Sequence, residues 1–141
     1  MAESYVLDTS ALLAYLQDEA GADTVMQILS AAQRRQCVAH VSFITLAELY
    51  YVTWQEEGES AAKELIALVK SLPLSTVESC ERLTLSAGRI KANHRLSLGD
   101  AFVAATALQV QGTLVHKDPE FEQVKGLVTC DPLPYKARGK P

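Results

Sequence analysis

The sequence predicts an α/β fold in which a central parallel sheet of about four to five strands is flanked by helices. Short apolar segments typical of buried strands alternate with longer segments whose apolar residues recur at helical spacing. Such alternation is typical of parallel sheets, because the crossover helices cover both faces. The 141 residues are 48% hydrophobic and 21% charged, which fits one domain with a substantial core.

The first part of the chain predicts two strands and two helices. Residues 5–7 form a short apolar strand, and Ser10 stands near the N-cap of a helix over residues 11–16. A second helix is predicted for residues 22–33, because its apolar residues lie three and four positions apart. Residues 37–41 then read as the second strand.

Two helices and a short strand are predicted for the middle of the chain. The third helix begins at Ser42 or Thr45 and runs to about Glu57, where a glycine breaks it. The fourth helix covers residues 61–72 and ends at a proline. Residues 74–77 form a short strand.

The C-terminal part predicts two more helices and two more strands, at residues 81–93, 100–110, 113–116 and 127–128. Gly99 marks a break between the two helices. We expect a single domain over residues 1–131, followed by an irregular tail at 132–141 that contains three prolines.

Four carboxylates stand where such a sheet brings ligands together. Asp8 and Asp118 follow the first strand and the strand at 113–116, and ligands of open parallel sheets bind beyond the carboxyl ends of strands. Glu48 and Asp100 lie at or near helix starts on apolar faces, where carboxylates are rarely left unpaired. The sequence therefore predicts one acidic cluster.

Each acid also has a purely structural interpretation. Asp8 is placed for a turn or a helix cap, Asp100 for an N-cap after Gly99, and Asp118 for an N-cap before Pro119. Glu48 completes a capping-box pattern that begins at Thr45. If Ser42 caps the helix instead, Glu48 lies deeper in the helix and this interpretation fails.

Four carboxylates in one cleft repel strongly unless they are protonated or bound to metal. Oxygen ligands without His or Cys suit Mg²⁺ or Mn²⁺ better than zinc. Such a site is suited to phosphoryl chemistry. Ser10 is placed to hydrogen-bond a phosphate, although capping alone explains it, and Thr9 is a weaker candidate for the same role.

The net charge and the basic and aromatic residues restrict the function less than the four acids do. The net charge is −4, and setting the four acids aside leaves 0, so charge neither supports nor excludes RNA as a ligand. The candidate phosphate contacts before Asp100 are Arg89, Lys91 and Arg95, with a solvated helix end as an equal alternative. Lys117 is placed to contact either a phosphate or a neighbouring carboxylate. Lys91 and Arg95 share a face if the helix continues. We expect core packing, rather than base stacking or a protein interface, for Tyr50, Tyr51 and Trp54.

The three cysteines and three histidines are scattered, and we expect structural roles for all of them, with the cysteines buried or half-buried. No signal peptide or membrane-length apolar run is recognisable, so a cytoplasmic location is expected.

Four motifs follow one another along the chain: Leu7-Asp8-Thr9-Ser10-Ala11, Thr45-Leu46-Ala47-Glu48-Leu49, Leu98-Gly99-Asp100-Ala101 and Leu114-Val115-His116-Lys117-Asp118 with Phe121. In this order they resemble the motifs of the PIN-domain ribonucleases, and most closely those of the VapC toxins of toxin–antitoxin systems. The resemblance covers nearly the whole chain and implies a PIN-like three-layer fold.

The resemblance implies a Mg²⁺- or Mn²⁺-dependent endoribonuclease with Asp8, Glu48, Asp100 and Asp118 as its acids and Ser10 as the hydroxyl residue beside them. Asp8 and Asp100 are expected to bind metal directly, and Asp118 directly or through water. The resemblance also implies a homodimer and inhibition by a small antitoxin protein. A stand-alone PIN nuclease in RNA processing and a non-catalytic cation-binding module remain alternatives. A phosphatase of the HAD type requires a second aspartate where Ser10 stands.

Overall fold

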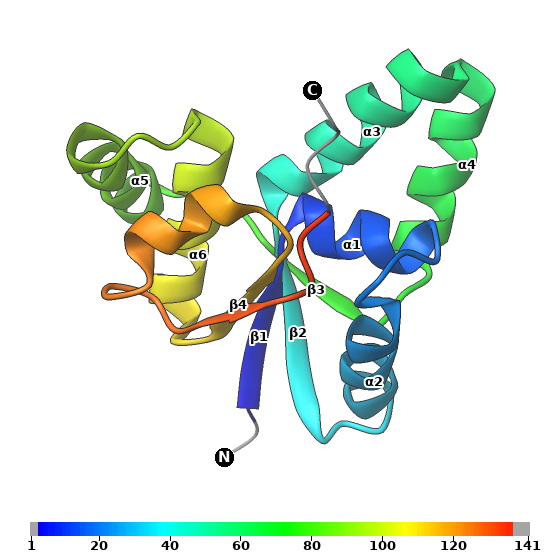
Figure 1. Cartoon of the computed structure of the whole chain (residues 1–141), viewed down its shortest axis with the longest axis horizontal. Helices are drawn as coiled ribbons and strands as arrows, with labels where there is room; N and C mark the ends of the chain where they lie inside the picture. The colour runs from blue at the N-terminus through cyan, green and yellow to red at the C-terminus, as the bar shows by residue number, and fades with distance from the viewer. Residues whose placement is uncertain (1–2, 137–141) are drawn as a thin grey trace.

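The computed structural model describes residues 3–136 and contains one five-stranded sheet, all parallel, in the order β3-β2-β1-β4-β5 (Figure 1). The strands are β1 (Glu3–Leu7), β2 (Cys37–Ser42), β3 (Leu74–Val77), β4 (Thr113–His116) and β5 (Cys130–Pro132). The helices are α1 (Thr9–Leu16), α2 (Ala22–Gln33), α3 (Phe43–Glu57), α4 (Glu59–Lys70), α5 (Glu81–Asn93), α6 (Leu98–Val110) and the 3₁₀ helix η1 (Pro119–Val124). The predicted α/β class and parallel sheet are confirmed.

Alternating side chains of the central strands divide the core into two halves. Val6 and Leu114 are fully buried on one face, beneath α5, α6 and η1. Leu7 and Val115 are fully buried on the other face, with side chains of α1, α2, α3 and α4. Figure 1 shows α5 and α6 on one side of the sheet and α1 and α2 on the other, with the α3–α4 hairpin extending beyond it. This is the three-layer arrangement that the alternation predicts.

Side-chain caps determine where the helices begin, and they decide between the alternatives that the sequence left open. Asp8 is the N-cap of α1, two positions before Ser10, and its carboxylate accepts from the Ala11 amide. Ser42 is the N-cap of α3, which excludes the capping box that would explain Glu48. The N-cap of α6 is a serine three residues before Asp100, so the predicted break at Gly99 and the Asp100 cap are both wrong.

The C-terminal strand lies later in the chain than predicted. Residues 127–128 form a turn, and the strand is β5, which pairs with β4 through Leu114 and Cys130. A proline at the end of β5 is tolerated because β5 is an edge strand. Leu133 is buried and its amide donates to the carbonyl of His116 at 2.7 Å, so the chain stays packed beyond the expected boundary at 131. Part of the tail, residues 137–141, lies outside the described residues.

The strand order creates a switch point between β1 and β4. The chain adds β2 and β3 on one side of β1, and then returns to place β4 and β5 on the other side. In open α/β sheets, binding sites form at such a point, beyond the carboxyl ends of the strands. Within residues 3–136, no helix combines the length and the apolarity that crossing a bilayer requires.

Candidate active site

Asp8 lies directly after β1, at the switch point between β1 and β4. Its side chain is 4% exposed, and Oδ1 accepts from the backbone amide of Ala11 at 2.8 Å. The same carboxylate accepts from the hydroxyl of Ser10, with 2.7 and 2.8 Å separating Oγ from its two oxygens. Asp8 is therefore both a helix cap and a candidate site residue, because its remaining lone pairs are free to bind a ligand.

Ser10 joins the ends of β1 and β4. Its hydroxyl donates to Asp8 and accepts from the backbone amide of Lys117 at 2.8 Å, across 107 positions of sequence. Asp118 is the next residue after Lys117, so this bond fixes the loop that carries the second acid relative to the first. The Lys117 ammonium donates to the Ala20 carbonyl at 2.9 Å and lies 3.6 Å from a carboxylate oxygen of Glu19.

Glu48 reaches the site from the first half of α3. Its Oε1 accepts from the hydroxyl of Thr9 at 2.7 Å, which gives Thr9 a specific role in orienting this acid. Its Oε2 lies so close to Gly99 that a Cβ there would stand 2.7 Å away. Gly99 therefore lies inside α6 because the carboxylate of Glu48 needs the space, and not because the helix breaks there.

Asp100 and Asp118 come together with a third acid that the sequence analysis missed. Among residues 3–136, one group of three acidic side chains offers oxygens that all lie within 4.8 Å of one another: Asp100, Asp118 and Glu120. Asp118 caps η1 by accepting from the Glu120 amide at 2.9 Å, as its structural interpretation predicts. This short turn brings the side chain of Glu120 beside that of Asp118. In the sequence, the acidic pattern Asp118-Pro119-Glu120 could have indicated that Glu120 lies beside Asp118.

Burial and mutual repulsion mark this cluster as electrostatically strained. Desolvation raises the pKa of Asp8 to about 7, and the charges of Asp100 and Asp118 add to this effect. Desolvation likewise raises the pKa of Asp100 to about 7, helped by the charges of Asp118, Glu48 and Glu120. A divalent cation would remove this penalty, and an all-oxygen donor set fits Mg²⁺ or Mn²⁺. The four predicted acids therefore belong to one electrostatically coupled group.

His116 has the structural role expected of it. It is 1% exposed, its Nδ1 accepts from the Asp118 amide at 3.2 Å, and its ring packs on Phe121. Burial lowers the pKa of His116, so the neutral form that can accept this bond is favoured. The cysteine prediction is wrong for Cys80, which is exposed and caps α5 with its sulfur.

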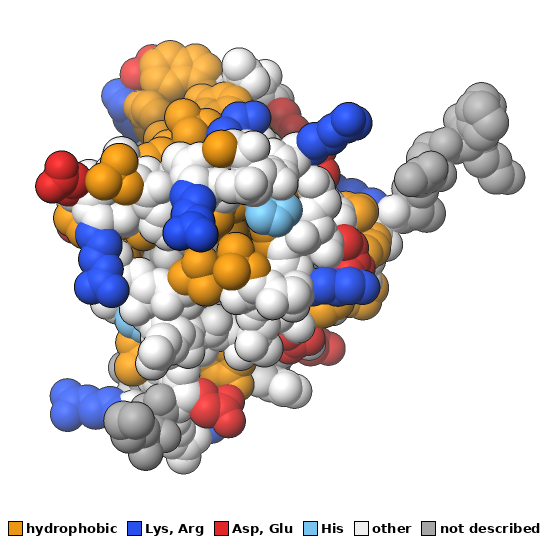
Figure 2. Space-filling model, turned by 90° about the vertical axis from the view of Figure 1, so that its left-hand side faces the viewer, with side chains coloured by type: hydrophobic (Ala, Val, Ile, Leu, Met, Phe, Trp, Pro, Cys, Tyr) orange, Lys and Arg blue, Asp and Glu red, His pale blue; other side chains and the backbone are white. Residues whose placement is uncertain are grey.

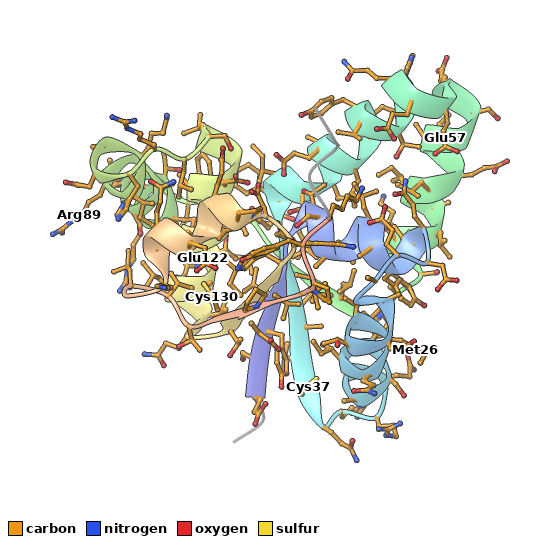
Figure 3. The ribbon with its side chains drawn as sticks, in the orientation of Figure 1. Met26, Cys37, Glu57, Arg89, Glu122 and Cys130 are labelled. Carbon is orange, nitrogen blue, oxygen red and sulfur yellow. The ribbon has the colours of Figure 1, made fainter. Side chains whose placement is uncertain are left out.

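The predicted basic contacts are spread apart. Arg89 points away from α5 into solvent (Figure 3), and Figure 2 shows separated Lys and Arg side chains on this face instead of one continuous patch. The expectation that Lys91 and Arg95 share a helix face is wrong, because α5 ends at Asn93. The side chain of Lys117 is 4% exposed and already engaged. Phosphate binding by these four residues stays a prediction.

The aromatic residues after Glu48 are less buried than expected. Tyr51 is 51% exposed and Trp54 is 42% exposed, so the prediction of core packing is wrong for both. Tyr50 is half-buried and packs edge-to-face on Trp54, with ring centroids 5.5 Å apart. These residues lie on α3, which projects beyond the sheet in the α3–α4 hairpin (Figure 1).

The fold and the site together define a class of α/β protein with an acidic, oxygen-donor site at the switch point of a parallel sheet. The family model described as PIN domain matches residues 5–127, and the chain belongs to that family. The predicted resemblance to PIN domains is confirmed. Comparison with curated proteins gives no match.

Solved structures show the same fold. VapBC2 from Rickettsia felis, bound to a promoter DNA fragment, has a TM-score of 0.73 at 18% identity, covering 93% of this chain and 99% of that chain. DNA-bound VapBC from Salmonella typhimurium has a TM-score of 0.72 at 18% identity, covering 94% and 98%. VapC20 from Mycobacterium tuberculosis, described as a sarcin-ricin loop cleaving toxin, has a TM-score of 0.68 at 18% identity, covering 85% and 94%.

Proposed function

We propose that the protein is a Mg²⁺- or Mn²⁺-dependent endoribonuclease that hydrolyses RNA phosphodiester bonds, and that it is the toxin of a toxin–antitoxin pair. The observation that carries the proposal is the convergence of Asp8, Glu48, Asp100 and Asp118 at the switch point of a PIN-family fold. Buried acids that repel one another cost stability, so their presence favours a role in binding a cation.

Asp8, Asp100 and Asp118 are the proposed metal-binding residues, and Glu120 joins them because its carboxylate lies in one group of oxygens with those of Asp100 and Asp118. When bound, a divalent cation supplies positive charge that stabilises the charge developing on a phosphate during hydrolysis. The raised pKa values of Asp8 and Asp100 reflect the charge that such a cation would balance.

The remaining site residues are proposed to position these acids and the substrate. Ser10 holds Asp8 and the chain before Asp118 in fixed relation through its two hydrogen bonds. Thr9 orients Glu48, whose other oxygen lies against the backbone of α6 near Asp100. The exposed Arg89 and Lys91 are proposed to contact the RNA backbone away from the acids.

The toxin assignment rests on the fold neighbours, several of which are described as VapBC or toxin–antitoxin complexes. We propose a small antitoxin protein as partner, a homodimeric state and a cytoplasmic location. The exposed Tyr51 and Trp54 on the projecting hairpin are the surface that we assign to a protein partner, because large exposed aromatic residues are enriched at interfaces.

The proposal is tested by RNA cleavage with purified protein in Mg²⁺, in Mn²⁺ and in EDTA. Wild type is compared with Asp8→Asn and Asp100→Asn, and with Glu64→Gln, an exposed acid on α4, as the matched control. We expect cleavage only by wild type and the control, and only with a divalent cation. Equal activity in all samples would overturn the metal-site proposal.

Two other observations separate the remaining alternatives. A neighbouring small reading frame that encodes a DNA-binding fold favours the toxin, whereas its absence favours a stand-alone PIN nuclease. Cation binding without RNA cleavage would leave only the non-catalytic module.

A further inference from the structure

A cavity of about 320 Å³ adjoins the acidic cluster. It shares Ser10 and Asp118 with the cluster and extends away from them, between the end of α1 and the chain that follows β5. Its volume is at the lower end of the range for small-molecule sites. Because the cavity begins at two site residues, a group attached to a phosphate that is held at the acids would extend into it.

One wall of the cavity is an aromatic ring held from two sides. The ring of Tyr135 stacks on that of His116, with centroids 6.1 Å apart and planes inclined by 29°. The Tyr135 hydroxyl donates to Glu122 at 3.1 Å, and Glu122 lies on η1 (Figure 3). Leu13 and Pro119 add apolar surface to the lining. The ring is therefore positioned before any ligand arrives, which lowers the entropic cost of stacking on it.

The two lysines of the cavity are already paired with a carboxylate, and Glu56 and Asp118 add further negative charge to the lining. The ammonium of Lys136 lies 3.0 Å from Glu19, whose other oxygen lies 3.6 Å from the ammonium of Lys117. These lysines lower the pKa of Glu19, so the carboxylate stays ionised and keeps both lysines occupied. The cavity thus offers little uncompensated positive charge to a phosphate and is better suited to a neutral group.

Two polar side chains that line the cavity have no hydrogen-bond or ion-pair partner in the described part of the chain. Within residues 3–136, the side chains of Gln17 and Glu56 make no hydrogen bond or ion pair with another side chain or with the backbone, and both are exposed. An amide and a carboxylate supply donors and acceptors that match the edge of a nucleobase.

We infer that this cavity is a nucleobase subsite, in which the base next to the scissile phosphate stacks on Tyr135 and is hydrogen-bonded by Gln17 and Glu56. The inference rests on the proposed ribonuclease function and deepens it, because it names the part of the RNA that the protein recognises. Single-stranded RNA is commonly read in this way, by stacking on aromatic side chains and by hydrogen bonds to base edges.

The test is a titration of the ¹⁵N-labelled full chain in EDTA, followed by the backbone amide signals of Leu13, Gln17 and Tyr135. Adenosine is the probe, ribose is the matched control without a base, and N-acetylarginine amide represents an arginine of a protein partner. We expect adenosine to shift these signals and ribose to leave them in place. If ribose shifts them equally, or if only the arginine amide shifts them, the inference is overturned.

Variants connect the signal to the aromatic wall. Tyr135→Leu is expected to weaken adenosine binding by about tenfold, the loss typical of one stacked base. The matched control is Tyr5→Leu, because Tyr5 also donates its hydroxyl to a glutamate but lies in the middle of β1 and lines a different cavity. Gln17→Trp, at an exposed position on the cavity wall, should block binding without altering the core. Unchanged binding in both Tyr135→Leu and Gln17→Trp would overturn the inference.

Cleavage assays separate this inference from the proposed function. If wild type cleaves RNA, Tyr135→Leu should raise KM far more than it lowers kcat. Adenosine binding at these residues without any RNA cleavage would refute the ribonuclease and leave the base site standing. RNA cleavage without adenosine binding would support the ribonuclease and refute the base site.

Discussion

The hydroxyl of Ser10 connects two loops that are distant in sequence but adjacent at the site. Ser10→Ala removes the bond to Asp8 and leaves the Lys117 amide without its acceptor. We expect the free energy of unfolding to fall by about 1–2 kcal/mol, since an unsatisfied partly buried donor costs this much. Urea unfolding measures the change, with Ser60→Ala on the exposed side of α4 as control. RNA cleavage should fall as well. A loss of stability no larger than that of the control would contradict the bridging role.

The raised pKa of Asp100 predicts that removing its charge stabilises the fold by an amount that depends on pH. The fold holds the proton of Asp100 more tightly than the unfolded chain does, because its pKa rises from 3.8 to about 7. The cost of the charge is therefore absent below about pH 4 and complete above about pH 7. In EDTA, Asp100→Asn should stabilise the protein at pH 8 by about 1–2 kcal/mol, after allowance for solvent screening.

Thermal unfolding in EDTA across pH 4 to 8 measures this difference. Wild type should lose stability as pH rises through this window, whereas Asp100→Asn should lose less. Glu64→Gln should follow wild type. A gain that is equally large at pH 4 would indicate a packing effect instead of relief from charge.

At the level of elements, Gly99 lets the Glu48 carboxylate of α3 lie against the backbone of α6. Gly99→Ala would place a methyl group where the Glu48 carboxylate now lies. Because Glu48 ends a flexible side chain, the carboxylate should move rather than the helices. We expect RNA cleavage to fall by about tenfold or more, as displaced catalytic groups commonly cause, with little change in stability.

Gly88→Ala provides the matched control for this prediction. Gly88 lies inside α5 with open space around its Cβ position. Alanine there should stabilise the helix by about 0.5–1 kcal/mol and leave cleavage unchanged. Melting temperature and cleavage rate together distinguish the two glycines. Similar behaviour of both variants would show that Gly99 has no special relation to Glu48.

Most helices and strands were predictable because their periodicity is strong. The helices at residues 22–33 and 81–93 and the strand at 113–116 have the bounds that the pattern predicts. The strand expected at 127–128 is wrong, since two apolar residues can equally pack a turn against the core, as Val128 does. Asp8 and Asp118 were predictable because each follows the end of a strand, whereas Glu120 enters the site only through the geometry of a short 3₁₀ turn.

Burial of side chains on α3 could not be predicted from the helix alone. Leu49 is fully buried, while Tyr51 is 51% exposed on the same helix. Local apolar patterning does not tell whether another layer covers a given face, because that depends on how far the helix extends past the sheet. The same reason hides the cavity beside Ser10, which combines α1 with residues more than a hundred positions later.

For the whole molecule, the site connects the two layers of helices that the sheet separates. Asp8 and Glu48 come from the layer of α1 and α3, while Asp100 and Glu120 come from the layer of α6 and η1. Their mutual repulsion acts between the layers, so a cation bound among them should hold the whole domain together. Mg²⁺ or Mn²⁺ at 100 times its Kd should stabilise the fold by about 2.7 kcal/mol, or roughly 5–10 °C in Tm.

The measurement is a series of thermal melts of metal-stripped protein at pH 8 with increasing Mn²⁺ or Mg²⁺. Na⁺ at matched ionic strength is the control for screening, which acts on all exposed charges alike. Wild type should show a saturable rise in Tm, and the double variant Asp8→Asn/Asp100→Asn should show none beyond the effect of salt. Because the double variant lacks the repulsion, it should already melt higher than metal-free wild type. An equal rise in Tm for both proteins would place the cation elsewhere and remove the physical basis of the proposed site.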